Sequence, residues 1–274
     1  MEIEKHMGNP RTVEISDTQN DSKIAKTLLF DAGTPFPDFE PGQFLMIWVP
    51  GVDEIPMSIS YWESSTAGIT INPVGDATIA LSSLSKGDRI GIRGPFGNPF
   101  TYGPGEFLVV GGGIGMAPLR PLVHNLLGLD GQVTLIIAAR TKSELVYLSE
   151  FESYKDKKLR LVCTTDDGSK GHHGIAKDAT EKVLASNSPD AIYACGPELM
   201  LSGLHQIAME RRIPFQASLE RFMKCGCGIC GTCALDPTGD LVCLEGPVFT
   251  GDELVRITEF GKYNRDSMGV RRKC

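Results

Sequence analysis

The sequence predicts a multidomain protein of the β plus α/β class that has three parts. Short apolar or alternating runs bounded by glycine, proline and aspartate fill residues 10–100 and indicate a six-stranded antiparallel β-barrel. Beyond Pro104, apolar strands alternate with helical segments, which is typical of a Rossmann-like parallel α/β domain. Five of the eight cysteines then fall between residues 225 and 243 and indicate a small cysteine-rich segment. We therefore expect domains at residues 1–103, 104–215 and 216–274.

The strands of the predicted barrel are short and closely spaced. Turn residues separate the runs KIAKTLLF, GQFLMIWVP, PMSISYW and GITINPV, and a further strand follows a turn in GDRIGIRGPFG. In the second domain, continuous apolar strands are expected in EFLVVGGG, QVTLIIAAR, LRLVCTT, AIYACGP and IPFQASLE. Helices are expected between them in APLRPLVHNLLG, SELVYLSEFESY, GIAKDATEKVLA and ELMLSGLHQIAMERR. This alternation predicts a sheet that helices cover on both faces.

The composition excludes several classes of protein. The 274 residues carry a formal net charge of −7, which argues against binding to a nucleic-acid backbone. No apolar run approaches the ~20 residues needed to span a bilayer, and the first ten residues lack the apolar core of a signal peptide. We therefore expect no nucleic-acid or membrane partner and a cytoplasmic location. Because thiols are kept reduced there, the cysteines favour metal or redox sites over disulfides.

A strand runs into a helix through four glycines in VVGGGIGMAP, and these are Gly111, Gly112, Gly113 and Gly115. Such a turn lets a phosphate approach the backbone and lie at the N-terminus of the helix. The full dinucleotide pattern also needs an acid roughly 20 residues further on, but the next strand ends in Ala139 and Arg140. The turn therefore predicts a nucleotide site, with a tight turn that binds no ligand as the alternative. Because an arginine near this position can accommodate a 2′-phosphate, the sequence does not decide between NAD and NADP.

A second strand ends in Cys195, Gly196 and Pro197 before a helix. Ligands of parallel sheets collect beyond the carboxyl ends of the strands, so Cys195 is expected beside the glycine turn. A buried apolar thiol is the alternative. The segments PMSISYW and INPVGDAT in the barrel region, taken by themselves, predict only strands and a turn.

The cysteine-rich segment has the spacing of an iron–sulfur site. Cys225, Cys230 and Cys233 form C-x4-C-x2-C, the spacing of plant-type two-iron clusters, and Cys243 supplies a fourth thiolate. The glycines between them allow a loop that wraps closely and points N–H groups at sulfur. Structural zinc held by Cys227, Cys230, Cys233 and Cys243 is the alternative. With an iron–sulfur cluster, Cys227 is a fifth thiol without an assigned role.

The order of the three parts along the chain resembles that of the ferredoxin–NADP reductase superfamily. These parts are the barrel, the α/β domain with the glycine turn, and the cysteine loop at residues 225–233. The chain is most similar to the electron-transfer subunits of class 1B dihydroorotate dehydrogenases, over most of its length. The most specific match is MKCGCGICGTC with VCLEGPVF, which resembles the C-terminal [2Fe–2S] segment of those subunits. GGGIGMAPL and YACGPELM resemble the pyridine-nucleotide motifs of the superfamily, and PMSIS resembles its flavin motif.

The resemblance implies a set of FAD and cluster residues. Pro56, Met57 and Ser58 would line FAD, and the cluster ligands would be Cys225, Cys230, Cys233 and Cys243. The ribityl and diphosphate end of FAD would lie against Ile71, Asn72, Pro73, Gly75, Ala77 and Thr78. Two positions depart from the family, because Ile55 and Asn72 stand where relatives carry basic residues toward the diphosphate. Backbone N–H groups around Gly75 are expected to compensate.

The resemblance also implies a function. Dihydroorotate would be oxidised on an FMN-containing catalytic subunit, and a heterotetramer of the two subunits is expected. Electrons would pass singly through the [2Fe–2S] cluster to FAD, which would deliver a hydride to NAD⁺ in pyrimidine biosynthesis. No catalytic side chain is assigned, since a hydride step requires no general base. The alternatives are a reductase subunit for a hydrogenase or transhydrogenase, and a zinc-stapled nucleotide-binding regulator without redox activity.

Overall fold

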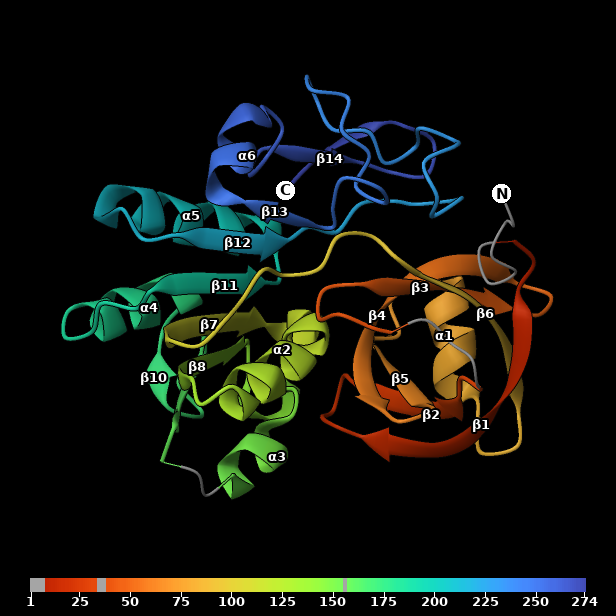
Figure 1. Cartoon of the computed structure of the whole chain (residues 1–274), viewed down its shortest axis with the longest axis horizontal. Coiled ribbons are helices and arrows are strands. Elements are labelled where there is room, and N and C mark those ends of the chain that lie inside the picture. Colours follow the sequence, from red (N-terminus) through yellow and green to blue (C-terminus); the bar gives the residue numbers. More distant parts are fainter. Residues whose placement is uncertain (1–7, 34–37, 155–156) are drawn as a thin grey trace.

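The computed structural model describes residues 8–33, 38–154 and 157–274. Residues 1–7, which form most of the segment judged to lack a signal-peptide core, lie outside the described residues. Figure 1 shows a barrel beside an α/β layer, with the C-terminal segment lying across both. Within the described ranges, no helix is long and apolar enough to cross a membrane.

The first part is a closed antiparallel barrel of six strands, as predicted. In spatial order the strands are β1 (Arg11–Asn20), β2 (Lys26–Asp31), β5 (Thr66–Ile71), β4 (Asp53–Glu63), β3 (Phe44–Val49) and β6 (Arg89–Phe96). The register places Met46 of β3 opposite both Pro56 of β4 and Arg93 of β6. Alternate side chains fill the interior with leucine, isoleucine and valine.

A short helix, α1 (Asp76–Ser83), follows the fifth strand and packs on the barrel (Figure 1). The sequence predicted only a turn here. Ala77 and Leu81 are the buried residues of this helix, so its apolar pattern is too sparse to recognise. The helix begins directly after Gly75, and its first turn faces the same edge of the barrel as the end of β5.

The second part is a seven-stranded sheet in the order β10-β9-β8-β7-β11-β12-β13. Its strands are β7 (Glu106–Gly112), β8 (Gln132–Ala139), β9 (Leu159–Thr165), β10 (His172–His173), β11 (Ala191–Cys195), β12 (Phe215–Ser218) and β13 (Val248–Thr250). All neighbours are parallel except β12 and β13. Its helical segments are η2 (Gly113–Gly115), α2 (Met116–Gly128), η3 (Lys142–Glu144), α3 (Leu148–Ser153), α4 (Ala176–Leu184) and α5 (Glu198–Arg211). One core contains α2 and α3 and the other contains α4 and α5, so helices cover both faces.

The predicted helix over SELVYLSEFESY is interrupted. Residues 142–144 form η3, and α3 begins only at Leu148, because Tyr147 takes a left-handed backbone conformation (φ 59°). The Tyr147 side chain is buried, and its hydroxyl bonds to Thr70 of the barrel. Docking of the barrel therefore overrides the local helical pattern at this position.

The C-terminal segment is not a separate lobe. It returns to the sheet through β13 and continues through α6 (Gly251–Arg256), β14 (Tyr263–Arg265) and β15 (Arg271–Lys273). The predicted boundary after residue 215 falls within β12. Cys233 and Cys243 share a core with Phe44 and Met46 of the barrel and with α5. The cysteine loop is therefore packed against both preceding parts.

Candidate functional site

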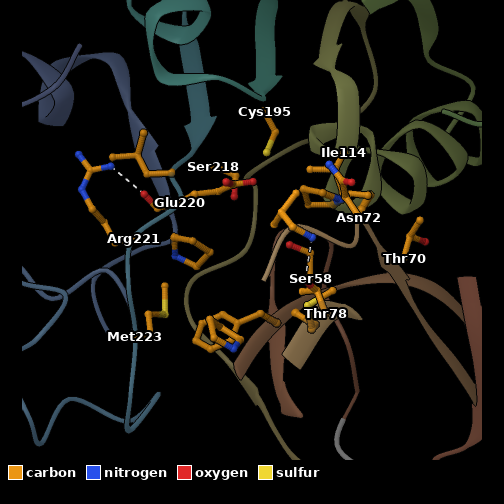
Figure 2. A pocket seen from close by; sticks show the side chains of 18 residues that line it. Ser58, Thr70, Asn72, Thr78, Ile114, Cys195, Ser218, Glu220, Arg221 and Met223 are labelled. Atoms are coloured by element: carbon orange, nitrogen blue, oxygen red, sulfur yellow. Dashed lines mark hydrogen bonds between the residues drawn. The ribbon is translucent and has the colours of Figure 1, made fainter. Parts of the chain in front are cut away.

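A pocket of about 390 Å³ lies where the barrel meets the carboxyl ends of the sheet strands. We call it the barrel-side pocket. The sequence-predicted residues that line it are Pro56, Met57, Ser58, Asn72, Thr78 and Cys195. Figure 2 shows Cys195 pointing into this space from the end of its strand, opposite Ser58 and Thr78 of the barrel. The tertiary structure thus brings together two motifs that are far apart in the sequence.

The remaining residues predicted to lie beside FAD surround the start of α1. The side chains of Ile71 and Ala77 point into the barrel core, whereas Pro73 and Gly75 are exposed in the turn. Thr78 Oγ1 accepts the N–H groups of Val74 and Gly75 at 3.0 and 2.9 Å. These bonds hold the turn at the mouth of the pocket, where the N-terminus of the helix favours an anion.

The glycine turn and the Cys-Gly-Pro motif are in direct contact. A Cβ atom on Gly115 would lie 2.3 Å from the Cys195 carbonyl oxygen, so a larger residue would separate the two strand ends. Gly111 lies within buried β7, next to Cys195 of β11 in the register. The two motifs predicted from the sequence therefore form one continuous wall.

A second pocket, of about 400 Å³, opens beyond this wall. We call it the sheet-side pocket. It is lined by Gly112, Gly113, Gly196 and Pro197, and it shares Asn72, Ile114 and Glu220 with the barrel-side pocket. The two pockets are neighbours at the carboxyl edge of the sheet, where such folds bind nucleotides. Both have the size expected of a cofactor site.

An acid that the sequence pattern missed lies in the sheet-side pocket. Arg140 binds Glu144 through its Nε and a terminal nitrogen, at 2.9 and 3.1 Å. Both residues line the pocket. Glu144 follows the strand by five positions, on η3, and the sequence analysis looked for the acid at the strand end itself. The spacing of four residues between Arg140 and Glu144 was the feature of the sequence that could have indicated this pair.

Glu220 is the second functional candidate that the sequence analysis missed. It follows β12 and lies at the junction of the two pockets, near Cys195 (Figure 2). Although Glu220 is open to the space inside the pockets, protein surrounds its carboxyl group, and this burial raises its pKa. Burial, with the Glu220 charge nearby, also raises the pKa of the Cys195 thiol, so Cys195 is a neutral wall residue.

The neighbouring Arg221 anchors this strand end. Its guanidinium bonds to Glu198 at 2.6 and 3.0 Å and to Glu259 at 2.9 Å. All three side chains are at most 10% exposed. Because breaking one partner of a buried ion pair leaves an uncompensated charge, this network holds the cysteine-rich segment firmly on α5.

The four predicted cluster cysteines lie near one another, and Cys227 lies among them. The Cys225 thiol interacts with those of Cys227, Cys230 and Cys243, and Cys243 also interacts with Cys233. Within the described part of the chain, no three His, Cys, Asp or Glu side chains gather around one point as ligands of a single ion. A two-iron cluster needs four thiolates, and the four predicted cysteines fit that number; Cys227 is a fifth thiol beside them.

Backbone N–H groups point at these sulfur atoms. Cys225 Sγ accepts from Ile229 and Cys230 at 3.3 and 3.4 Å, and Cys243 Sγ accepts from Gly228 at 3.2 Å. Burial raises the pKa of the Cys225 thiol, but the backbone N–H groups of Cys227, Cys230 and Ile229 outweigh burial and lower its pKa to about 6. The loop therefore favours a thiolate, the form that binds metal, at Cys225, whereas burial and the neighbouring Cys233 raise the pKa of Cys243.

Comparison with known proteins agrees with this geometry. Residues 220–255 match the model of the iron–sulfur cluster binding domain of dihydroorotate dehydrogenase B, and residues 109–206 match that of the oxidoreductase NAD-binding domain. A protein of Methanocaldococcus jannaschii, named probable dihydroorotate dehydrogenase B (NAD(+)), electron transfer subunit, is 43% identical. The alignment covers 96% of this chain and 98% of that relative. The chain belongs to the family of dihydroorotate dehydrogenase B electron transfer subunits.

Other members and a solved structure extend the match. A Pyrococcus horikoshii family member with the same name is 43% identical over 93% of this chain and 95% of its own length. An NADH-dependent reduced ferredoxin–NADP oxidoreductase, solved in a study of flavin-based electron bifurcation, superposes with a TM-score of 0.78. It is 29% identical, and the match covers 92% of this chain and 95% of that one. The predicted family and fold class are therefore confirmed.

Proposed function

We propose that this chain carries electrons from dihydroorotate oxidation, which takes place on the FMN of a catalytic subunit, to NAD⁺ in pyrimidine biosynthesis. Electrons enter through a [2Fe–2S] cluster and leave through FAD. The observation that carries this proposal is the contact of three sites in one molecule. The cysteine loop packs on the barrel, the barrel-side pocket adjoins it, and the sheet-side pocket shares three residues with that pocket.

The residues present fit the three cofactors. FAD supplies the conversion between single electrons and a hydride when it is bound. Pro56, Met57, Ser58 and Asn72 line its pocket. Because the N–H groups of Val74 and Gly75 are bonded to Thr78, we propose that the N-terminus of α1, and not these two groups, favours the diphosphate in place of the missing basic side chain at Ile55. Gly112, Gly113 and Gly196 leave room for the pyridine nucleotide. The cluster ligands are Cys225, Cys230, Cys233 and Cys243. We assign no ligand role to Cys227, so zinc is not proposed.

The sheet-side pocket favours NAD over NADP. The Arg140 guanidinium is already paired with Glu144, whose carboxylate would repel a 2′-phosphate. A carboxylate at such a position instead accepts a hydrogen bond from the ribose 2′-hydroxyl. This agrees with the NAD-linked names of the relatives.

The catalytic subunit is proposed to dock over the cysteine loop, in a heterotetramer in the cytoplasm. Cys230 is exposed at the edge of this loop, and Ile229 beside it is 84% exposed. Leu244 lies against Gly228 of the loop and is half exposed. Exposed apolar residues around an electron entry point are typical of a protein interface.

The test combines the purified chain with its FMN-containing subunit. Iron, sulfide and FAD should co-purify, and dihydroorotate should reduce NAD⁺ only when both subunits are present. Cys233→Ser should remove the cluster, leave FAD bound and abolish this coupled reaction. If the wild-type pair supports no dihydroorotate-dependent reduction of NAD⁺, the proposed pathway is wrong and another electron donor, such as a hydrogenase, must be tested.

A further inference from the structure

A buried arginine of the barrel faces the cysteine loop. Arg93 is on β6, and its side chain is 9% exposed. Its Nε and one terminal nitrogen donate to the two carboxylate oxygens of Glu54, on β4, both at 2.7 Å. Such a bidentate pair fixes the guanidinium plane. Neither residue belongs to a motif recognised in the sequence.

The same guanidinium contacts the loop. Its terminal nitrogen also donates to the Cys225 carbonyl oxygen at 3.0 Å, and the guanidinium interacts with the Cys227 side chain. Between these residues, Gly226 has φ +71° and lies over Met46, where an added Cβ would come within 2.6 Å of the side chain. The loop is therefore seated on the barrel wall directly above Arg93, and a side chain at position 226 would collide with Met46.

Glu54 connects this contact to the flavin motif. It lies on the same strand as Met57 and Ser58, which line the barrel-side pocket. Glu54, Arg93 and the Cys225 carbonyl thus form a continuous hydrogen-bonded connection from that strand to a cluster ligand. Within this connection the positive guanidinium of Arg93 contacts the loop directly, whereas the Glu54 carboxylate is bonded to the guanidinium.

We propose that Arg93 is a positioning residue that seats the cluster loop on β3 and β6 of the barrel, and that its charge favours the reduced cluster. Reduction adds one electron, and so one negative charge, which a nearby cation stabilises. Glu54 limits this effect by partly neutralising Arg93. The Cys227 side chain is then part of the contact surface with Arg93. The inference rests on the proposed function only in requiring a cluster in this loop.

The test measures the midpoint potential of the cluster in the isolated, FAD-loaded chain, by redox titration with dithionite monitored by electron paramagnetic resonance. Arg93→Gln should favour the oxidised cluster by about tenfold, which corresponds to about 59 mV for one electron. Glu54→Gln should shift the potential in the opposite direction, and the double variant should return toward wild type. Arg89→Gln, on the same strand with its side chain 70% exposed, is the matched control and should shift nothing.

Opposite shifts separate charge from structure, because general loosening of the loop would move both single variants in the same direction. Shifts of equal sign, or no shift in Arg93→Gln, would overturn the inference. If Arg93→Gln does not retain iron, Glu54→Gln decides: a raised potential supports the inference and an unchanged one overturns it. The titration uses neither dihydroorotate nor the catalytic subunit, so its outcome is independent of the identity of the electron donor.

Discussion

Glu220 illustrates what a single residue contributes to the site. Its carboxyl group is at the junction of the two pockets and near Cys195. In the sequence it is one of many acidic residues, and it follows a strand without any motif of its own. Only the turn of the chain from β12 toward Arg221 places it beside the nucleotide site. Single-sequence reasoning found the cysteines and glycines because their spacing is informative, whereas the position of Glu220 is a tertiary property.

We predict that Glu220→Gln weakens binding of NAD⁺ by about tenfold, because the carboxylate attracts the positively charged nicotinamide ring. Affinity for ADP-ribose, which lacks that ring, should not change. The raised pKa of Glu220 means that the wild-type advantage is present at high pH and is lost as the carboxyl group takes up a proton on acidification. Calorimetric titrations of the oxidised protein measure both ligands. Glu210→Gln, on exposed α5 surface, is the control, and an equal loss for both ligands would contradict the prediction.

At the scale of elements, the barrel and the sheet are joined by α2 and α3. Arg120 of α2 donates to the Ser60 carbonyl of the barrel at 3.0 Å and to Glu150 of α3 at 2.8 Å. Glu150 also bonds to His124 at 2.7 Å. The sequence predicted most strands and helices of both parts, since their periodicity is strong, but it named no strand at β1, where only Val13 and Ile15 are buried. It did not predict α1, the interruption at Tyr147 or β13, because each depends on contacts with a distant part of the chain.

We predict that Glu150→Gln lowers the free energy of unfolding by about 1.5–3 kcal/mol at about pH 7, since it weakens the charged hydrogen bond to Arg120 and the bond to His124. Burial raises the pKa of Glu150, but His124 and Arg120 outweigh burial and lower it below 4.5. The stabilisation is therefore complete above that value and is lost as pH falls through the lowered pKa. Urea unfolding at about pH 7 and about pH 3.5 tests this dependence. Glu152→Gln on the same helix, in a more exposed pair with Lys170, should cost less; a loss that persists unchanged in acid would contradict the prediction.

At the scale of the whole molecule, the cysteine-rich segment unites the parts. Arg221 ties it to α5, Arg93 ties it to the barrel, and β13 adds it to the sheet. One side of the cysteine loop therefore lies on β3 and β6 of the barrel, and the other side, with Cys230 and Ile229, is exposed. This arrangement suits a carrier that receives electrons at its surface and delivers a hydride inside.

We predict that Ile229→Asp weakens assembly with the catalytic subunit by at least about tenfold, because a charge would be buried in an apolar contact. NADH-dependent reduction of ferricyanide through FAD should be unaffected in the isolated chain. Size-exclusion chromatography and the dye assay measure the two properties. Met268→Asp, which replaces another side chain that is 85% exposed, is the control. Normal assembly of the Ile229 variant would exclude the loop from the interface.

The sequence alone indicated the barrel, the α/β domain with its glycine turn, and a cysteine-rich segment with iron–sulfur spacing, because periodicity and spacing are local properties of the chain. The tertiary structure decided which residues meet. It placed Glu220 between the pockets, paired Glu144 with Arg140, and set Arg93 beneath the cysteine loop. Glu220 and Arg93 carry no signal in the sequence, since the fold alone brings their partners near, whereas the four-residue spacing of Arg140 and Glu144 is visible in the sequence. The motifs expected to bind cofactors could therefore be recognised in the sequence. Glu220 and Arg93, which are proposed to influence NAD⁺ binding and the potential of the cluster, could not.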